Sequence, residues 1–574
     1  MHRYILSTLL VLAALPLMAQ APPAPPTEAT TLPATPTNQQ LSLTYTVPDS
    51  GAIAKGISVD LIDLARLEAA LQSRNEGRTL RMTLDQAIAL TLSQNDDLLI
   101  ASFGPQKAEA DTLAAHGEFD PALQGKASYL NSSTSASQQV YAFGGISQIK
   151  AFQTTVQGGI GGKLHYGTQY GVTFDSTKEE STFSNFVEEF QAGLTFTLTQ
   201  PLLRGYGKDA NMVRIRAAQT SKALSQAQLE SVVFKVIADT IKAYWDLAGA
   251  AESLTVKRGA LENAQRLLAI NEKRRGIGTA ADLDVVQAKA GVAMRQSDMV
   301  TAFAQVENAG DILKNVMGLR EEGAFSKAQI AAVDRPNVGE ITAFDPALSD
   351  TGLQTALESA LQRRPEMRMA DLQIESAQLE EDRARHDMRP QFDVTGSYMQ
   401  GGRDHKLLQT LSGIKDKQDT SFSYGVQGAV PLGNRAARGA YQRAHLTRRE
   451  TEQRKTQARQ TVEMNVHLAH RAVETNQILV ESTRQACRLQ EVNVTAEERR
   501  LQLGVTTSFQ VLKVQEDLTA ARTQEVQAEV ALEKARIDLL AADGRLLEER
   551  GITFEAPEAE PAPGYIESIT PRWK

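Results

Sequence analysis

One predicted helical face carries the side chains best suited to bind a metal ion. Glu463, His467, His470 and Glu474 lie four, three and four residues apart, so a helix places all of them on one side. Imidazole and carboxylate groups in such an arrangement are ligands that zinc accepts. The same spacing is also typical of a polar stripe between helices, and we favour that interpretation. The sequence therefore predicts no metal site and no cofactor.

The rest of the chain lacks the motifs that commonly carry catalysis. It contains no glycine-rich phosphate loop, no Gly-x-Ser-x-Gly motif and no Cys-x-x-Cys pair. The only cysteine, Cys487, has no neighbour that would activate it, so we expect a packing residue. A net charge of −8 argues against a nucleic-acid partner. We therefore predict that the protein is not an enzyme and binds no nucleic acid.

Residues 1–21 have the pattern of a secretory signal peptide. A short apolar run from Ile5 to Leu17 follows a weakly positive start, and the small residues Ala19 and Ala21 come next. No later apolar run reaches the length of about 20 residues that a transmembrane helix needs. The pattern indicates an exported protein that is periplasmic, extracellular or inserted in a membrane as a β-barrel.

The remaining residues divide into two structural repeats with connecting segments. We assign 22–78 to a proline- and threonine-rich linker, 79–320 to the first repeat, 321–351 to a second linker, 352–550 to the second repeat and 551–574 to a tail.

The duplication is clearest in the helices that follow two loops, around Gly278 and Gly504. When these glycines are aligned, both copies show spacings of three and four residues, the seam of a coiled coil. The seam positions are Val285, Ala288, Val292, Arg295, Met299, Ala302, Val306, Ala309 and Leu313, then Val511, Val514, Leu518, Ala521, Glu525, Ala528, Leu532, Ala535 and Leu539. Each half thus predicts a helical hairpin, whose longer arm approaches about 90 Å at about 1.5 Å per residue.

Alternating apolar and polar residues predict strands in both halves. The stretches are 163–174 and 191–199 in the first half, and 393–399 and 421–430 in the second. Strands with one apolar side suit a wall that faces lipid, and a soluble hairpin on a helical domain is the alternative. Because small barrels need about eight strands, four principal strands would have to close a barrel by oligomerisation.

The first half is longer than the second between Asp120 and Pro201. Asp120 corresponds to Asp393, 273 positions further on, whereas Pro201 corresponds to Pro431, only 230 positions further on. The difference between 273 and 230 leaves 43 additional residues in the first half. An extra hairpin in an external loop, added barrel strands and disorder are all compatible with this insertion.

Two repeated motifs connect the duplication to a known family. The pattern Gly-x-x-x-x-[Leu/Phe]-x-Val-[Val/Leu] begins at both Gly278 and Gly504. The segments Thr199–Gly205 and Val430–Gly433 look like strand-to-helix junctions. Together with the duplication, these motifs resemble the TolC family of outer-membrane efflux proteins.

The resemblance covers residues 80–320 and 350–547 and implies a mainly helical fold with some β structure. The tandem helical hairpins would form an α-barrel. Each subunit of a homotrimer would add four strands to one twelve-stranded β-barrel in the outer membrane.

The function that the resemblance implies is an outer-membrane exit channel for efflux or type I secretion. The channel would lie among outer-membrane lipids, with its long helical portion in the periplasm. It would dock to a periplasmic adaptor protein and an inner-membrane pump, and its cargo would pass without chemical change. The alternative is a periplasmic or surface coiled-coil structural or adaptor protein, which would not need strand pairs in both halves.

The two loops match the family's adaptor-docking hairpin tips. Glycine permits the positive φ needed for a tight reversal between helices, and its bare backbone lets a partner approach. Simple helix-ending glycines are the alternative. The predicted docking residues are Ile277, Gly278, Thr279, Leu503, Gly504 and Val505.

The gate departs from the best-known family pattern. Asp284 matches a family aspartate, but the positions of its tyrosine and arginine partners hold Leu501 and Thr506, so those links cannot form. The positions of the acidic pore ring hold Gln510 and Lys513. A different charge pattern in the pore is one interpretation, and solvated residues near a helix start are the other. The residues we assign to this pore or gate are Asp282, Asp284, Gln510 and Lys513.

Overall fold

The computed structural model describes residues 43–46, 56–58, 79–319 except 146 and 280, 329–335 and 350–554. The predicted signal peptide lies outside these residues, as do most of both predicted linkers and of the tail. No helix among the described residues has the length and apolar character needed to cross a membrane.

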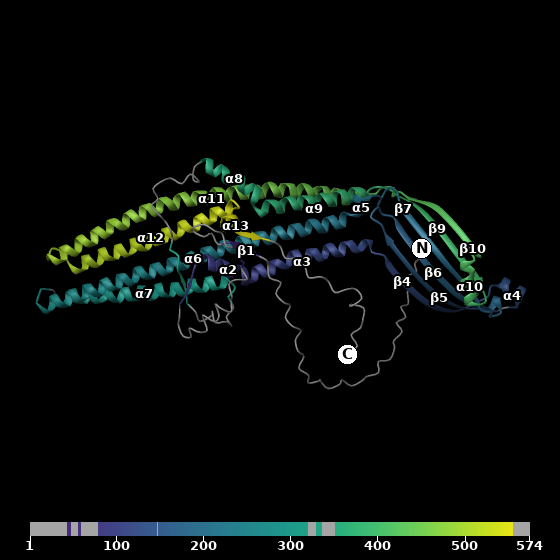
Figure 1. Ribbon diagram of the computed structural model, residues 1–574, viewed down its shortest axis with the longest axis horizontal. Coiled ribbons are helices and arrows are strands. Elements are labelled where there is room, and N and C mark those ends of the chain that lie inside the picture. Colours follow the sequence, from purple (N-terminus) through teal and green to yellow (C-terminus); the bar gives the residue numbers. More distant parts are fainter. Residues whose placement is uncertain are drawn as a thin grey trace, which may run out of the picture. The chain divides into compact units, whose positions relative to one another are not determined.

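Two helical hairpins dominate the structure, as the sequence predicts (Figure 1). In the first, α6 (Val213–Gly276) leads to α7 (Asp282–Val316), and in the second, α11 (Arg435–Gln502) leads to α12 (Ser508–Ala542). The incoming helices have 64 and 68 residues, which makes each about 100 Å long. The predicted seam residues are buried or half-buried along these helices, so the coiled-coil prediction is confirmed.

The described helices form a layer of four near the large antiparallel sheet, which is described below, and another layer of four farther from that sheet. Near the sheet, α3 (Asp96–His116) packs on α6, α6 on α9 (Pro365–Asp387), and α9 on α11. Farther from the sheet, α7 packs on α6, α6 on α12, and α12 on α11 (Figure 1).

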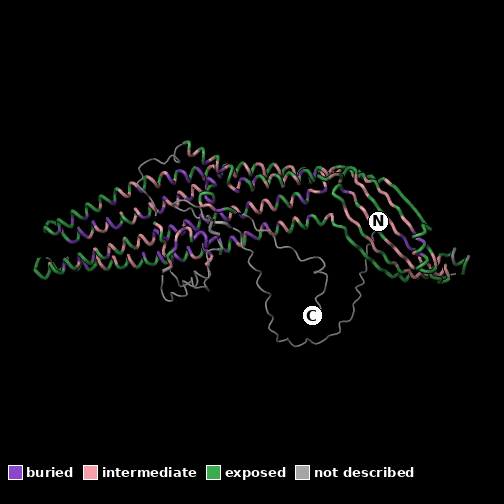
Figure 2. Tube along the Cα trace, viewed as in Figure 1, coloured by how far each residue is buried: buried purple, intermediate pink, exposed green. Residues whose placement is uncertain are grey.

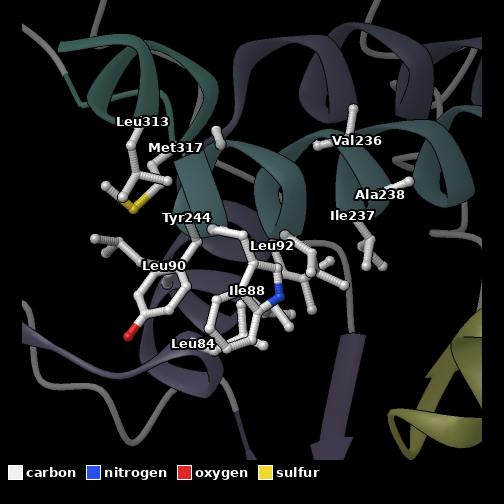
Figure 3. Close-up of a cluster of buried hydrophobic side chains, with 14 of the residues drawn as sticks. Leu84, Ile88, Leu90, Leu92, Val236, Ile237, Ala238, Tyr244, Leu313 and Met317 are labelled. Carbon is white, nitrogen blue, oxygen red and sulfur yellow. The ribbon is translucent and has the colours of Figure 1, made fainter. Parts of the chain in front are cut away.

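A compact core at the middle of the first half joins the helices to a small parallel sheet. That sheet pairs β3 (Thr79–Met82) with β8 (Gln329–Ala332), and α2 (Leu84–Gln94) follows β3 directly. The fully buried Tyr244 of α6 lies beside Leu84 and Leu90 of α2 in this cluster (Figure 3). Its hydroxyl oxygen is 2.8 Å from Asp334 Oδ2. Because burial disfavours the charged phenolate, the pKa of Tyr244 is raised well above its usual range.

The shorter elements fill the connections. The helices are α4 (Gln138–Gly144), α5 (Lys208–Asn211), α8 (Asp350–Arg363), α10 (Leu407–Lys415) and α13 (Leu546–Glu549). A three-stranded sheet joins β1 (Leu43–Thr46), β2 (Gly56–Ser58) and β11 (Ile552–Phe554). Thus the predicted first linker contains two strands, and the predicted tail begins with a third.

The large antiparallel sheet has six strands, not the four that the sequence predicts. Its order is β10-β9-β7-β6-β5-β4. The strands are β4 (Ala122–Ser135), β5 (Gln148–Lys163), β6 (Gln169–Ser181), β7 (Glu189–Pro201), β9 (Gln391–Asp404) and β10 (Asp419–Ala429). The expectation of four strands per subunit is therefore wrong, and a trimeric barrel of twelve strands no longer follows from it.

The two additional strands come from the insertion. Asp120 lies just before β4 and Asp393 lies at the start of β9, while Pro201 ends β7 and Pro431 follows β10, so β5 and β6 have no counterpart in the second half. Only part of the predicted strand at 163–174 is a strand, because residues 164–168 form the turn between β5 and β6. Gly167, with φ of +91°, reverses the chain there.

Candidate functional site

The first hairpin tip ends α6 with a glycine in the left-handed conformation. The Gly278 N–H donates to the Arg275 carbonyl at 2.9 Å, and the Thr279 N–H donates to the Arg274 carbonyl at 2.8 Å. This pair of hydrogen bonds is the Schellman motif, and it requires the φ of +73° that Gly278 adopts. Ile277 projects from the turn with 75% of its surface exposed.

The second tip repeats this geometry 226 positions later. The Gly504 N–H donates to the Leu501 carbonyl at 3.0 Å, and the Val505 N–H donates to the Arg500 carbonyl at 2.9 Å. Gly504 has φ of +72°, and Leu503 is 78% exposed. The six predicted docking residues thus form two matching, exposed turns, which lie at the ends of the hairpins far from the sheet (Figure 2).

Side chains brace the second tip more than the first. The Thr506 hydroxyl donates to the buried carboxylate of Glu497, and Arg500 pairs with the same carboxylate at 3.0 Å. The Ser508 hydroxyl lies 2.9 Å from Asn271 Oδ1 of α6, which ties the start of α12 to the first hairpin.

The first-tip aspartates make contacts within the tip itself, Asp284 with the start of α7 and Asp282 with the end of α6. The Ala281 N–H donates to Asp284 Oδ2 at 3.2 Å, which caps the start of α7. Asp282 is 3.6 Å from Arg275, and both side chains are largely exposed. Negative charge is favoured at this position by the helix dipole.

The second-tip gate residues are also engaged locally. Lys513 pairs with Asp517 at 3.4 Å, and the exposed Gln510 lies in the first turn of α12. Leu501, which occupies the position of a family tyrosine, is buried with Leu267 and Val511. Among the described residues of one chain, no hydrogen bond or ion pair joins any of the four predicted gate residues to another.

The large sheet has one apolar face that runs across every strand. A single row of directly opposed residues consists of Leu123, Ile160, Val172, Phe196, Tyr398 and Phe422. A row on the opposite face consists of Lys126, Gln157, Asp175, Gly193, Gly401 and Asp419. One apolar and one polar face is the arrangement of a wall between lipid and a water-filled lumen.

The predicted polar stripe on α11 does not gather into a metal site. The Glu463 carboxylate accepts a hydrogen bond from Arg459 at 2.8 Å, and His470 is buried. Across the described part of the chain, no group of three or more metal-ligating side chains comes together.

Cys487 lies in a buried cluster between the arms of the second hairpin. Its neighbours there include Val494, Val514 and Leu518. Burial, together with a hydrogen bond to Glu525, raises the pKa of the Cys487 thiol to about 11. Because the thiolate is the reactive form, this cysteine is inert at neutral pH.

Sequence reasoning missed the strand β5 and the full length of β6. The segment around residues 157–163 contains four glycines, which weaken the alternation that marks a strand. The signal that could have found β5 is the length of the insertion, because 43 residues suffice for a hairpin of full-length strands.

Comparison with known proteins agrees with this architecture. The family model for outer membrane efflux protein matches residues 87–319 and 356–545, which is most of the chain. The protein belongs to the outer membrane efflux protein family. This membership confirms the predicted TolC-like family, the location in the cell outer membrane and a role in efflux transport, within a family of channel proteins.

Individual relatives of this outer membrane efflux protein are distant in sequence. The pyoverdine export outer membrane protein OpmQ of Pseudomonas aeruginosa is 22% identical over 379 residues, which cover 64% of this chain and 73% of OpmQ. The outer-membrane channel OprN matches with a TM-score of 0.59 and 18% identity, over 80% of this chain and 89% of OprN. The CmeC outer membrane channel of Campylobacter jejuni matches with a TM-score of 0.58 and 16% identity, over 90% of this chain and 96% of CmeC. At these identities, the structural matches establish the fold.

Proposed function

We propose that three copies of this outer membrane efflux protein form an exit channel for efflux or type I secretion. The channel conducts cargo passively after the helical tips dock to a periplasmic adaptor protein and, through it, to an inner-membrane pump. The observation that carries this proposal is the sheet whose apolar face crosses all six strands, because such a face suits contact with outer-membrane lipid. The name of the relative OpmQ, a pyoverdine export outer membrane protein, supports a role in export.

Exposed apolar side chains on the flanking helices support assembly from several copies. In one chain, α7 and α11 form the two outer sides of the tip-proximal helical layer. Contiguous apolar surface on a soluble portion marks contact with another protein. The exposed residues are Val286, Met294, Val300 and Ile312 on α7, and Met464, Leu468, Ile478 and Leu489 on α11.

The two matched tips support the docking step. Ile277, Leu503 and Val505 are apolar and at least 66% exposed, although nothing in the turn geometry requires apolar residues there. The glycines beside them have no atom within 4 Å of the place where a Cβ would stand, so the backbone is open to a partner. A helix-ending role explains the glycines and leaves the exposed apolar residues unexplained.

The alternative of a periplasmic or surface coiled-coil protein accounts for less of the molecule. It explains the helical hairpins and their seams. It gives no role to a six-stranded sheet with an apolar face, which in water would be an aggregation hazard. We therefore retain the channel as the function.

The docking step can be tested by removing apolar contact at both tips. In the Ile277→Ser, Leu503→Ser double variant, we expect export in cells that carry the partner pump to fall about tenfold, the effect of about 1.4 kcal/mol of lost binding. Single-channel conductance of the purified variant should not change, because the substitutions remove no part of the wall.

A control is Leu432→Ser, which changes a side chain that is 97% exposed in the segment between β10 and α11, far from the tips. This variant should export normally. Normal export by the double variant, at normal protein levels, would contradict docking through the tips.

A further inference from the structure

The inserted strands β5 and β6 are integral members of the sheet. β5 pairs with β4 along its length, from Gly161 opposite Ala122 to Gln148 opposite Ser135. β6 continues the sheet from β5 to β7, and both inserted strands add side chains to the same apolar face. The insertion therefore adds two strands to the width of the large sheet and does not merely lengthen a loop.

The turn of the inserted hairpin is seated on the junction between sheet and helices. The Gly207 N–H, in the segment between β7 and α6, donates to the Tyr166 carbonyl at 3.2 Å. The His165 ring stacks on Phe119, after α3, with a centroid distance of 4.5 Å. A Cβ on Gly167 would stand 2.1 Å from the Gly205 carbonyl oxygen, so the turn is packed tightly against the junction. These contacts hold the turn of the inserted hairpin at the junction between sheet and helices.

The two edge strands of the sheet, β4 and β10, have few of the features that prevent an edge strand from pairing with another strand. Natural edge strands are usually blunted by lysine, proline or a bulge. Neither strand contains proline, and each contains a single charged residue, Asp419 in β10 and Lys126 in β4. Phe422 of β10 is 76% exposed and Leu123 of β4 is 84% exposed. Long, apolar and unprotected edges of this kind are suited to pair with another strand.

The directions of the two edges allow them to pair with each other. β4 leads away from α3, whereas β10 leads back to α11, so the two strands run antiparallel. A ring of copies joined in this way would be antiparallel throughout, as in outer-membrane barrels with an even number of strands.

The internal duplication predicts the register of this junction. Within one chain, Gly193 of β7 lies opposite Gly401 of β9. The second-half counterpart of Gly193, 230 positions further on, is Ser423 of β10, and the first-half counterpart of Gly401, 273 positions back, is Ser128 of β4. The same shifts place Phe422 opposite Tyr129, which keeps the apolar face continuous across the junction.

We infer that β10 of one copy pairs with β4 of the next, with Ser423 opposite Ser128, and that three copies close a barrel of eighteen strands. Six strands from each copy give this number, and the inference rests on the proposed trimeric channel.

At a spacing of about 4.8 Å and a tilt of about 40°, a barrel of eighteen strands has a circumference of about 110 Å, against about 75 Å for a barrel of twelve. Twelve helices, four from each copy, at a spacing of 8–10 Å give the helical tunnel a circumference of about 100–120 Å. The added hairpin thus matches the barrel to the helical tunnel, so the outlet admits cargo as wide as the tunnel itself.

Cysteine cross-linking tests the junction. Residues directly opposite on antiparallel strands have Cβ atoms about 4.5–5.5 Å apart, within reach of a disulfide after small adjustment. We expect the Ser128→Cys, Ser423→Cys double variant, oxidised in outer membranes, to yield a covalent trimer that a reducing agent separates. The native Cys487 need not be removed, because it is buried and its thiol is protonated at neutral pH.

The control variants show whether positions 128 and 423 are directly opposite each other or only near each other. Neither single variant should yield a covalent trimer, and Ser128→Cys with Phe422→Cys should yield none, because Phe422 lies on the opposite face. A trimer that conducts ions but gives no cross-link between positions 128 and 423 would overturn the inference and leave the channel intact. A protein that neither trimerises nor conducts would remove the proposed function, and the inference with it.

Discussion

The two halves of the chain connect their long helices by the same turn but contribute different numbers of strands to the large sheet. Both tips use the same pair of hydrogen bonds around a glycine, at φ of +73° and +72°. The first half adds four strands to the large sheet, whereas the second adds two. Few backbone geometries reverse the chain tightly after a helix, so both halves use the same one. An antiparallel sheet, in contrast, accepts another hairpin without changing the direction of any neighbouring strand.

An ion pair between the corresponding helices shows a smaller difference between the halves. Glu109 of α3 pairs with Lys222 of α6 at 3.0 Å, and both side chains are about one-third exposed. In the second half, Glu381 of α9 is buried and pairs with Arg448 of α11 at 2.5 Å, with His445 at 3.1 Å. The carboxylate that joins these helices is thus partly exposed in one half and enclosed in the other.

The largest effect is expected in the turn that only the first half possesses. Gly167→Ala should cost about 3 kcal/mol of stability, because it adds a clash with the Gly205 carbonyl to the strain of a positive φ. Gly145→Ala is the control, since Gly145 has φ of +65° and open space around it, and it should cost about 1 kcal/mol. Chemical denaturation followed by circular dichroism measures both. Equal costs would show that the inserted hairpin is not held against the junction.

A second test uses these two ion pairs and the pH dependence of the second. Burial opposes ionisation of Glu381, but hydrogen bonds from Arg448 and His445 outweigh it, so the pKa of Glu381 lies below its ordinary value of 4.5. The unfolded chain then binds this proton more readily, and the stability from the pair is lost as the pH falls from 4.5 through the lower folded-state pKa.

We therefore expect Glu381→Gln to lower the Tm by a few degrees at pH 7 and to leave it unchanged once the pH is below the folded-state pKa. Lys222→Gln, which breaks the solvated pair, should have a smaller effect at pH 7. Thermal unfolding at both pH values provides the comparison. A larger effect of Lys222→Gln would reverse the assignment of the stronger pair to the second half.

The smallest effect is expected where the halves are most alike. Gly278→Ala and Gly504→Ala should each cost about 1 kcal/mol, because neither methyl group meets another atom and only the positive φ is strained. The double variant should cost about 2 kcal/mol if the sites are independent. Denaturation midpoints measure these costs. Clearly unequal costs would show that the bracing of the second tip by Thr506 and Glu497 extends to its turn.

The helical part of the fold could be predicted from the sequence because its signals are long and repeated. Each seam persists over nine positions, and the seam residues of both halves are buried or half-buried. The strand number could not be predicted in the same way. In β5, the glycines that allow close strand packing also remove the alternating side chains on which a strand prediction depends.

The geometry of the tips could also be predicted, since a glycine at the end of a long helix commonly adopts the left-handed conformation that closes the helix. The positions of the gate residues could not. In a single chain, Asp284 caps its own helix and Lys513 pairs along its own helix, so any charge ring that they form depends on contacts with other copies. A sequence pattern records local spacing and says little about such a ring.

The central claim is a pore, and single-channel conductance in a planar bilayer tests it most directly. The wild-type trimer, extracted from outer membranes, should give discrete current steps. A variant in which a short turn replaces Gln148–Ser181 retains four strands per copy, and its conductance should fall to about half, since the diameter of a barrel grows roughly linearly with strand number. Absence of steps from both the wild-type trimer and its Asp284→Ala variant, which lacks one proposed gate side chain, would contradict the channel.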